Sequence, residues 1–165
     1  MTTTITIHTT PGWASALAYD ISQAEKSILI AALSGNAPTG KRAGPMAALW
    51  RELLAAPSRG VVARLVLPAP QTAHPATWAN MTSATKAHAA GVHTVLIPGA
   101  RLWHAKAAVI DDRIAWVGSG NLTDAAAVRN VEIWTRMNGA ELATDLLDII
   151  FREAEISDRT KRRAP

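Results

Sequence analysis

The sequence predicts an α/β domain in which a mixed, mostly parallel sheet is flanked by helices on both faces. Apolar blocks recur along the chain with turn signals between them, and their period alternates between that of a strand and that of a helix. The chain has 165 residues, of which 48% are hydrophobic. This length supports one hydrophobic core and is too short for two ordinary domains. We therefore expect a single domain over residues 1–165.

The first half of the chain alternates strands with helices. Residues 3–9 alternate in polarity like a short strand, and a helical pattern follows over residues 11–25. Residues 27–33 form the continuous apolar run that is typical of a buried central strand. Residues 34–44 are rich in Gly, Pro, Asn and Thr and form the longest flexible connection, placed to close over a substrate. A helix over residues 45–56 comes next.

The second half continues the alternation and then changes to a hairpin. Residues 61–67 and 92–97 are apolar strands, separated by a Pro-rich loop and a helix over residues 77–90. We expect three final elements: a hairpin over residues 103–118, a strand over residues 130–137 and an amphipathic helix over residues 140–155.

The composition limits the partners and the compartment. The chain has 17 Lys and Arg against 13 Asp and Glu, a net charge of +4, which is compatible with phosphate-rich partners. Cysteine is absent, so neither a disulfide nor a thiolate metal site is expected. The sequence contains neither a long apolar run nor a signal-peptide pattern. We expect a cytoplasmic protein without stable membrane association, or an exported one if a leader has been removed.

One stretch of the sequence gathers polar residues of catalytic type. His104 and Lys106 are two apart in a predicted strand and therefore share a face, and Ser119 and Asn121 obey the same parity. A two-residue hairpin turn at residues 111–112 or 112–113 would pair strand residues whose numbers add up to 223 or 225, respectively. His104 would then lie opposite Ser119 or Asn121, and both registers bring the four side chains together. Buried polar side chains need partners. A tetrahedral phosphoryl group would supply them.

Each residue type suits a role at such a group. Lys106 supplies a point charge, Ser119 and Asn121 supply neutral donors, and Gly120 removes side-chain bulk beside the ligand. His104 is the candidate nucleophile or proton carrier.

Two carboxylates have different expected roles. Glu132 is the candidate to accept a hydrogen bond from the distal ring nitrogen of His104, which would fix the tautomer of the imidazole. Asp111 has the opposite parity from His104 and lies at the predicted turn. We therefore expect Asp111 to be structural.

These residues resemble the signature of the phospholipase D superfamily, H-x-K-x₄-D followed by G-S-x-N, and the spacing fits without a gap. Six fixed residue types at these offsets would arise by chance on the order of once per 10⁸ starting positions. Asn130 and Glu132 also resemble, in type and spacing, the short bacterial nuclease branch of the family. The resemblance implies a phospholipase D-like α/β/α sandwich. It also implies structural roles for Asp111, Gly118, Gly120 and Asn130.

The resemblance implies a two-step hydrolysis that needs no metal and no cofactor. His104 would attack the phosphodiester to give a phosphohistidine, while a second histidine protonates the leaving oxygen. The chain carries one copy of the motif, so the second His104 is expected from the other subunit of a homodimer. The alternatives within the chain lack a Lys two residues further on and are more simply surface or core histidines. They are His8, His74, His88 and His93.

The favoured interpretation is a sequence-nonspecific endonuclease that cuts DNA, with RNA as an alternative substrate. A lipid phosphodiesterase stays open, although it would need an apolar docking surface or a membrane anchor. A noncatalytic nucleic-acid-binding module also stays open and would bind with steep salt dependence. The candidate substrate contacts are Lys41, Arg42, Arg101 and Arg129 for backbone phosphates, and Trp103 for stacking on a base or lining the pocket.

Overall fold

A computed structural model describes residues 3–40, 43–99 and 102–161 of the chain. The strands of these residues are β1 (Thr4–Thr9), β2 (Ser27–Ala31), β3 (Val62–Pro68), β4 (His93–Ile97), β5 (Ala107–Ile110), β6 (Ile114–Gly118) and β7 (Ile133–Asn138). The helices are α1 (Gly12–Ser22), α2 (Pro45–Ala55), α3 (Ala79–Ala89), α4 (Asp124–Val128) and α5 (Ala140–Lys161), with short 3-10 turns at Pro57–Arg59 and Pro75–Thr77.

The strands form one mixed sheet in the order β1-β7-β6-β5-β2-β3-β4. The mixed α/β class is confirmed, but the expectation of a mostly parallel sheet is wrong. Only β2–β3 and β3–β4 pair in parallel among the described strands, whereas β1–β7, β7–β6, β6–β5 and β5–β2 pair antiparallel. A tight hairpin makes β5 and β6 antiparallel. The other three antiparallel pairs join strands that are separated by longer stretches of chain, which local sequence patterns do not reveal.

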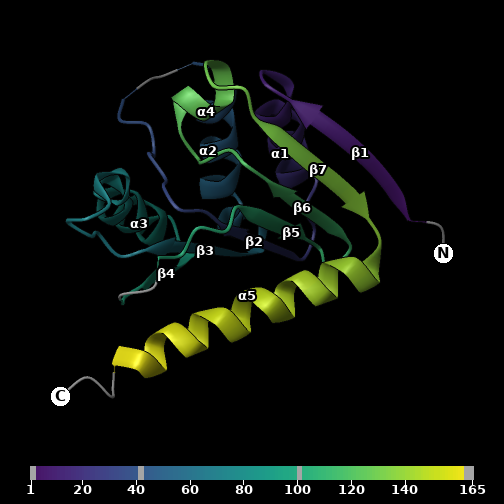
Figure 1. Cartoon of the computed structure of the whole chain (residues 1–165). Helices are drawn as coiled ribbons and strands as arrows, with labels where there is room; N and C mark the ends of the chain where they lie inside the picture. The colour runs from purple at the N-terminus through teal and green to yellow at the C-terminus, as the bar shows by residue number, and fades with distance from the viewer. Residues whose placement is uncertain (1–2, 41–42, 100–101, 162–165) are drawn as a thin grey trace.

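Helices cover both faces of the sheet, as the sequence predicts (Figure 1). On one face, α1, α2 and α3 pack on the strands around the fully buried Trp13, Leu49 and Trp116. On the other face, α5 crosses the sheet, and its Ala143 and Ile150 are buried in a cluster with apolar residues of β2, β3 and β5. The two faces thus have separate cores, and α5 covers the second face by itself among the described helices (Figure 1).

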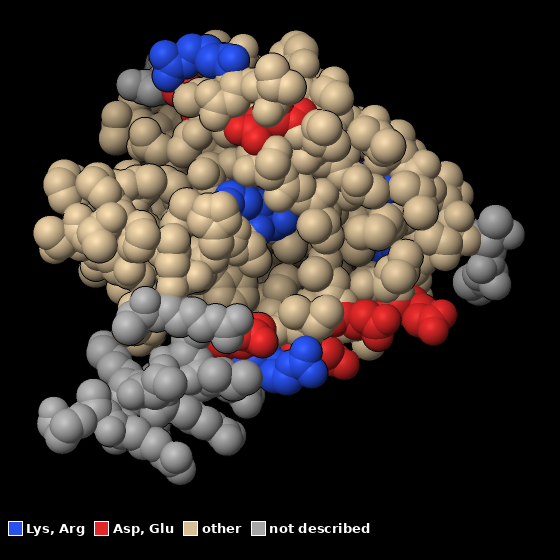
Figure 2. All heavy atoms as spheres, viewed as in Figure 1, with Lys and Arg blue, Asp and Glu red and all other residues tan. Residues whose placement is uncertain are grey.

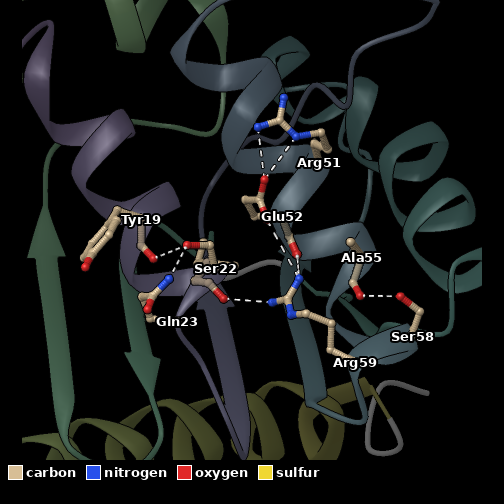
Figure 3. Close-up of polar contacts among 9 residues, drawn as sticks. Tyr19, Ser22, Gln23, Arg51, Glu52, Ala55, Ser58 and Arg59 are labelled. Carbon is tan, nitrogen blue, oxygen red and sulfur yellow. Dashed lines mark hydrogen bonds and ion pairs between the residues drawn. The ribbon is translucent and has the colours of Figure 1, made fainter.

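The contact between α1 and α2 is closed at its edge by one arginine (Figure 3). Arg59 donates a hydrogen bond to the backbone carbonyl of Ile21 at 2.9 Å and lies 3.9 Å from the Glu52 carboxylate. Glu52 also pairs with Arg51 at 3.0 Å. Such exposed ion pairs contribute little stability, so the α1–α2 contact depends mainly on its buried apolar side chains.

Several elements differ from the sequence prediction, among them the last strand, which begins at Ile133 rather than at residue 130. The connection before the last strand contains α4, whose Thr123 hydroxyl caps the helix by accepting from the Ala126 N–H at 3.3 Å. The last helix runs to Lys161 rather than to residue 155. Within the described residues, no helix combines the length and the apolar character that crossing a membrane requires.

Candidate active site

The segment that carries His104 and Lys106 lies immediately before β5. The start of β5 pairs with the end of β2, because Ala107 is opposite Ala31, and β3 ends beside them. The two residues therefore lie at the carboxyl ends of the parallel strands β2 and β3. Open α/β sheets bind their ligands at this end.

Lys106 is a buried cation whose ammonium group, within the part of the chain that the structure describes, is hydrogen-bonded to one residue. It is 7% exposed, and its Nζ lies 2.9 Å from Nδ1, 3.3 Å from Nε2 and 2.9 Å from the carbonyl oxygen of His104. Burial lowers the pKa of Lys106, and the nearby charge of Glu132 opposes that shift. Among the described residues, no carboxylate is hydrogen-bonded to this ammonium group, so an anion is the partner that the site lacks.

His104 is exposed at the mouth of the same site. The charge of Lys106 holds the pKa of His104 below its ordinary value of 6.5, and burial and the charge of His74 act in the same direction. A neutral imidazole therefore predominates near neutral pH. A neutral imidazole has one unprotonated ring nitrogen whose lone pair can serve as a nucleophile, and in this structure Lys106 Nζ, which can only donate, lies within hydrogen-bond distance of the ring nitrogens.

Glu132 is held away from the imidazole by two other residues. It is 8% exposed and accepts hydrogen bonds from the Ser119 hydroxyl at 2.5 Å and from the Asn130 amide at 3.0 Å. Its backbone N–H donates to the Thr10 hydroxyl at 3.1 Å. Glu132 therefore does not form the expected hydrogen bond with His104. Its charge instead acts on Lys106 and favours a higher pKa of that lysine.

The hairpin register differs by one residue from both expectations. Ala107 pairs with Val117 and Ile110 with Ile114, so the numbers of paired residues add up to 224. The loop contains the three residues 111–113, and both aspartates in it have a φ of 53°. The even sum leaves Lys106 opposite Gly118, whose N–H donates to the Lys106 carbonyl at 3.1 Å.

β6 ends at Gly118, so Ser119 and Asn121 follow the strand rather than lying in it. The expectation of four side chains on one strand face is wrong for this reason. Ser119 bridges to Glu132, and Asn121 Oδ1 accepts from the backbone N–H of Ser34 at 3.2 Å. The latter bond fixes which end of the amide faces inward, because only the oxygen can accept it.

Asp111 lies in the hairpin loop and caps another part of the backbone. Its carboxylate accepts from the N–H groups of Glu25, Lys26 and Ser27 at 2.8–3.2 Å. Burial would raise the pKa of Asp111, but these N–H groups and the charge of Arg113 outweigh it and lower the pKa. Asp111 thus ties the hairpin to the start of β2, at the end of the sheet opposite to His104.

The two motif glycines make room for tryptophans rather than for a ligand. A Cβ on Gly118 would lie 2.3 Å from the Trp134 ring, and a Cβ on Gly120 would lie 2.8 Å from Trp134 and 3.0 Å from Trp13. The two rings stack with centroids 4.9 Å apart. The expectation that Gly120 clears space beside the ligand is wrong. Gly120 instead leaves room for the stacked rings of Trp13 and Trp134.

The candidate substrate contacts differ in where the structure places them. Trp103 is 8% exposed and packs in the core beneath α5, so its ring is poorly placed to stack on a base, but it lines the cavity beside His104. Arg129 is exposed directly after α4. Lys41, Arg42 and Arg101 lie outside the described residues.

A cavity of about 460 Å³ opens beside the two motif residues. His104, Lys106 and Glu153 contribute its ionisable side chains, and Val117 and apolar side chains of α5 contribute to its apolar part. The apolar side chains from α5 are Leu146, Ile149 and Ile150. Within the described ranges, no three His, Asp or Glu side chains are grouped as a metal site would need.

Three residues at the site carry no strong sequence signal. Ser34 and Thr10 contact Asn121 and Glu132, respectively, through pairings that join distant parts of the chain. His74, which lacks the Lys two residues further on, nevertheless influences the pKa of His104. Only the predicted parity of neighbouring strands could have hinted at such contacts, and these residues lie in loops or at strand ends.

The site combines a buried lysine that lacks an anionic hydrogen-bond partner among the described residues with a neutral histidine, at the carboxyl end of the parallel strands. This combination is suited to phosphoryl transfer. Residues 17–153 match the family described as "Cardiolipin synthase, PLD-like domain". The chain therefore belongs to the phospholipase D-like family. No curated protein matches it in a sequence comparison.

Solved structures share the fold. Nuc from Salmonella typhimurium, a phospholipase D family member, superposes with a TM-score of 0.72 at 23% identity, over 89% of this chain and 91% of that one. NucT from Helicobacter pylori superposes with a TM-score of 0.67 at 17% identity, over 94% and 98% of the two chains. A phosphatidylserine synthase from Haemophilus influenzae reaches 0.66 at 13% identity, over 94% of this chain and 39% of that one.

Proposed function

We propose that this protein is a metal-independent, sequence-nonspecific endonuclease that hydrolyses DNA through a phosphohistidine at His104. The observation that carries the proposal is the buried ammonium group of Lys106, hydrogen-bonded to a neutral imidazole and to no carboxylate among the described residues. A phosphodiester supplies the missing anion and presents its phosphorus to the imidazole. RNA is the second nucleic-acid substrate to test.

The reaction has two displacement steps. A ring nitrogen of His104 forms a bond to phosphorus, the bond from phosphorus to the leaving oxygen breaks, and that oxygen takes a proton from a second histidine. Water then attacks phosphorus, gives a proton to the second histidine, and breaks the bond to His104. Lys106 stabilises the negative charge on the phosphoryl oxygens in both steps.

Asn121 is positioned to help bind the phosphate. Its oxygen is engaged by the Ser34 N–H, which leaves the amide NH₂ group as the donor available to a phosphoryl oxygen. Ser119 is engaged with Glu132, so its contribution is to hold that carboxylate at the distance where it supports the charge of Lys106. We propose Lys106 and Asn121 as direct phosphate contacts and Ser119 as their support.

A second copy of the chain supplies the second His104 in this proposal. Four exposed apolar side chains lie on the part of the sheet face that α5 leaves uncovered, and we call this set the open sheet face: Ile5, Ile7, Val117 and Ile133. Val117 also lines the cavity that holds His104. The proposed mechanism needs two histidines, and each copy of the chain supplies one. Because the open sheet face is apolar and adjoins the site, a second copy related by two-fold symmetry could bind there and bring its own His104.

Charge and likeness support nucleic acid as the substrate. The chain carries a net charge of +4, and Nuc and NucT share its fold. On the face shown in Figure 2, Asp and Glu side chains gather over α5. The substrate backbone is therefore expected to approach from the side away from α5, where Arg129 is exposed.

A lipid phosphodiester is the second candidate. The apolar wall that α5 contributes to the cavity favours it, because an acyl chain or glycerol could rest there. The family description and the phosphatidylserine synthase likeness point the same way.

One experiment separates these substrates. The wild type and His104→Ala are incubated in excess chelator with single- and double-stranded DNA, RNA and phosphatidylcholine vesicles. We expect cleavage of DNA by the wild type alone. Cleavage of lipid alone would establish the second candidate, loss of activity in chelator would contradict the metal-free mechanism, and binding without cleavage would indicate a noncatalytic module.

A further inference from the structure

Two polar side chains of α3 are buried and have no role in the site described above. Asn80 is 0% exposed and Ser83 is 1% exposed. Both lie on the side of α3 that faces the loop after β2. Burying such groups is costly unless they are fully hydrogen-bonded, so the contacts that they make identify what they hold.

Their hydrogen bonds converge on the backbone of residues 33–37. The Asn80 amide accepts from the Gly35 N–H at 2.9 Å and donates to the carbonyls of Leu33 and Pro68, each at 2.9 Å. The Ser83 hydroxyl donates to the Gly35 carbonyl at 2.8 Å and accepts from the Ala37 N–H at 2.9 Å. Together they fix this short segment from one side.

The other side of the same segment holds the end of the G-S-x-N motif. The Ser34 N–H donates to Asn121 Oδ1 at 3.2 Å, and the Ser34 carbonyl accepts from the Leu122 N–H at 3.0 Å. The Asn36 N–H donates to the Leu122 carbonyl at 3.0 Å. Residues 33–37 therefore lie between α3 and Asn121 and are hydrogen-bonded to both.

We infer that Asn80 and Ser83 are positioning residues, which set the amide orientation of Asn121 through residues 33–37. The inference rests on the proposed function, because it gives Asn121 the task of donating to a phosphoryl oxygen. The Ser34 N–H can bind only the amide oxygen, so a fixed Ser34 turns the NH₂ group outward. A loosened segment would let the amide rotate and lose that donor. Orientation errors of this kind weaken binding and catalysis without removing any group that touches substrate.

The test uses Ser83→Ala, which removes one hydroxyl and leaves the fold largely intact. KM for a chromogenic phosphodiester and the inhibition constant of orthovanadate, a phosphate mimic, are measured for the wild type, Ser83→Ala, Asn121→Ala and the double variant. We expect Ser83→Ala to raise both constants about three- to tenfold, the usual size of one hydrogen bond. In the Asn121→Ala background the same change should have no further effect.

Two controls make the outcome specific. Ile21→Val truncates a fully buried side chain of α1 and should lower the melting temperature with an unchanged vanadate constant. Additive effects in the double variant, or a vanadate constant unaffected by Ser83→Ala, would overturn the inference. His104→Ala separates the two proposals: if it is inactive while Ser83→Ala behaves as wild type, the positioning role alone fails, and if it stays active, the proposed function fails.

Discussion

Lys106 Nζ lies 2.9 Å from His104 Nδ1, and the lysine side chain is buried beneath the exposed imidazole. This contact joins the electrostatics of the two residues. The charge of Lys106 disfavours protonation of His104 and so keeps the imidazole neutral. The same charge is left to bind an anion at the point where the ring nitrogen would attack.

The first prediction concerns the protonation of His104. Because Lys106 lowers the pKa of His104, Lys106→Met should raise that pKa toward its ordinary value of 6.5. The measurement is an NMR titration of the His104 ring protons in both proteins. Lys26→Met, which removes an exposed lysine just before β2, should leave the titration unchanged. A lower or unaltered pKa in Lys106→Met would contradict the electrostatic account.

The same shift sets the pH dependence of activity. The nucleophile must be neutral, so kcat/KM should fall with decreasing pH only when the pH passes through the lowered pKa of His104. The acid limb of the wild-type profile is therefore expected below pH 6.5. Rate measurements on a chromogenic phosphodiester from pH 4 to 9 check this. An acid limb centred above that value would show that another group controls the step.

The motif glycines provide a prediction about packing. Gly118→Ala places a Cβ 2.3 Å from the Trp134 ring and 2.7 Å from the Ile133 carbonyl. Overpacking of this kind costs about 1–3 kcal/mol or more of the free energy of unfolding, which chemical denaturation can measure. Gly12→Ala is the matched control, because its Cβ would have no neighbour within 4 Å. Equal stability of the two variants would refute the steric role.

Asp111 provides a prediction about stability and pH. Its pKa is lowered in the folded protein, so its carboxylate stabilises the fold above the unfolded pKa of about 3.9. This stabilisation is lost as the pH falls through the folded pKa. Asp111→Asn should therefore be less stable than the wild type near neutral pH by about 1–2 kcal/mol. The difference should shrink below pH ~4, and a difference that stays constant down to pH 2 would count against the capping role.

The open sheet face provides a prediction about assembly. Ile133→Lys introduces a charge at a side chain that is 55% exposed and should convert a dimer into an inactive monomer in analytical ultracentrifugation with parallel assays. Tyr19→Lys, at a comparably exposed site on α1, should remain dimeric and active. A wild type that is monomeric and fully active would remove the shared-site proposal.

Local patterns predict much of the fold and the identity of the site. The apolar run after Lys26 and the helix that opens at Pro45 have clear signals in single stretches of sequence, and both form as expected. The spacing of His104 and Lys106 similarly brings them into direct contact. Such features depend on neighbours in the chain, which sequence periodicity describes well.

Features that depend on long-range pairing were harder to predict. Two consecutive aspartates with positive φ lie in a hairpin loop that is one residue longer than expected, and Ser119 and Asn121 lie beyond the end of β6 at Gly118. Asp tolerates this conformation but does not require it, so the register could not be decided from the sequence. The contacts of Glu132 with Ser119 and Thr10 likewise depend on pairing between separate segments of the chain.

The most direct test of the central claim is to look for the covalent intermediate. An oligonucleotide with internal ³²P is mixed with the protein in chelator, quenched in base, which preserves phosphohistidine, and mapped by peptide mass spectrometry. We predict a labelled adduct on His104 in the wild type and no label in His104→Ala. Cleavage at full rate by His104→Ala, or turnover by the wild type with the label on another residue, would contradict the proposal.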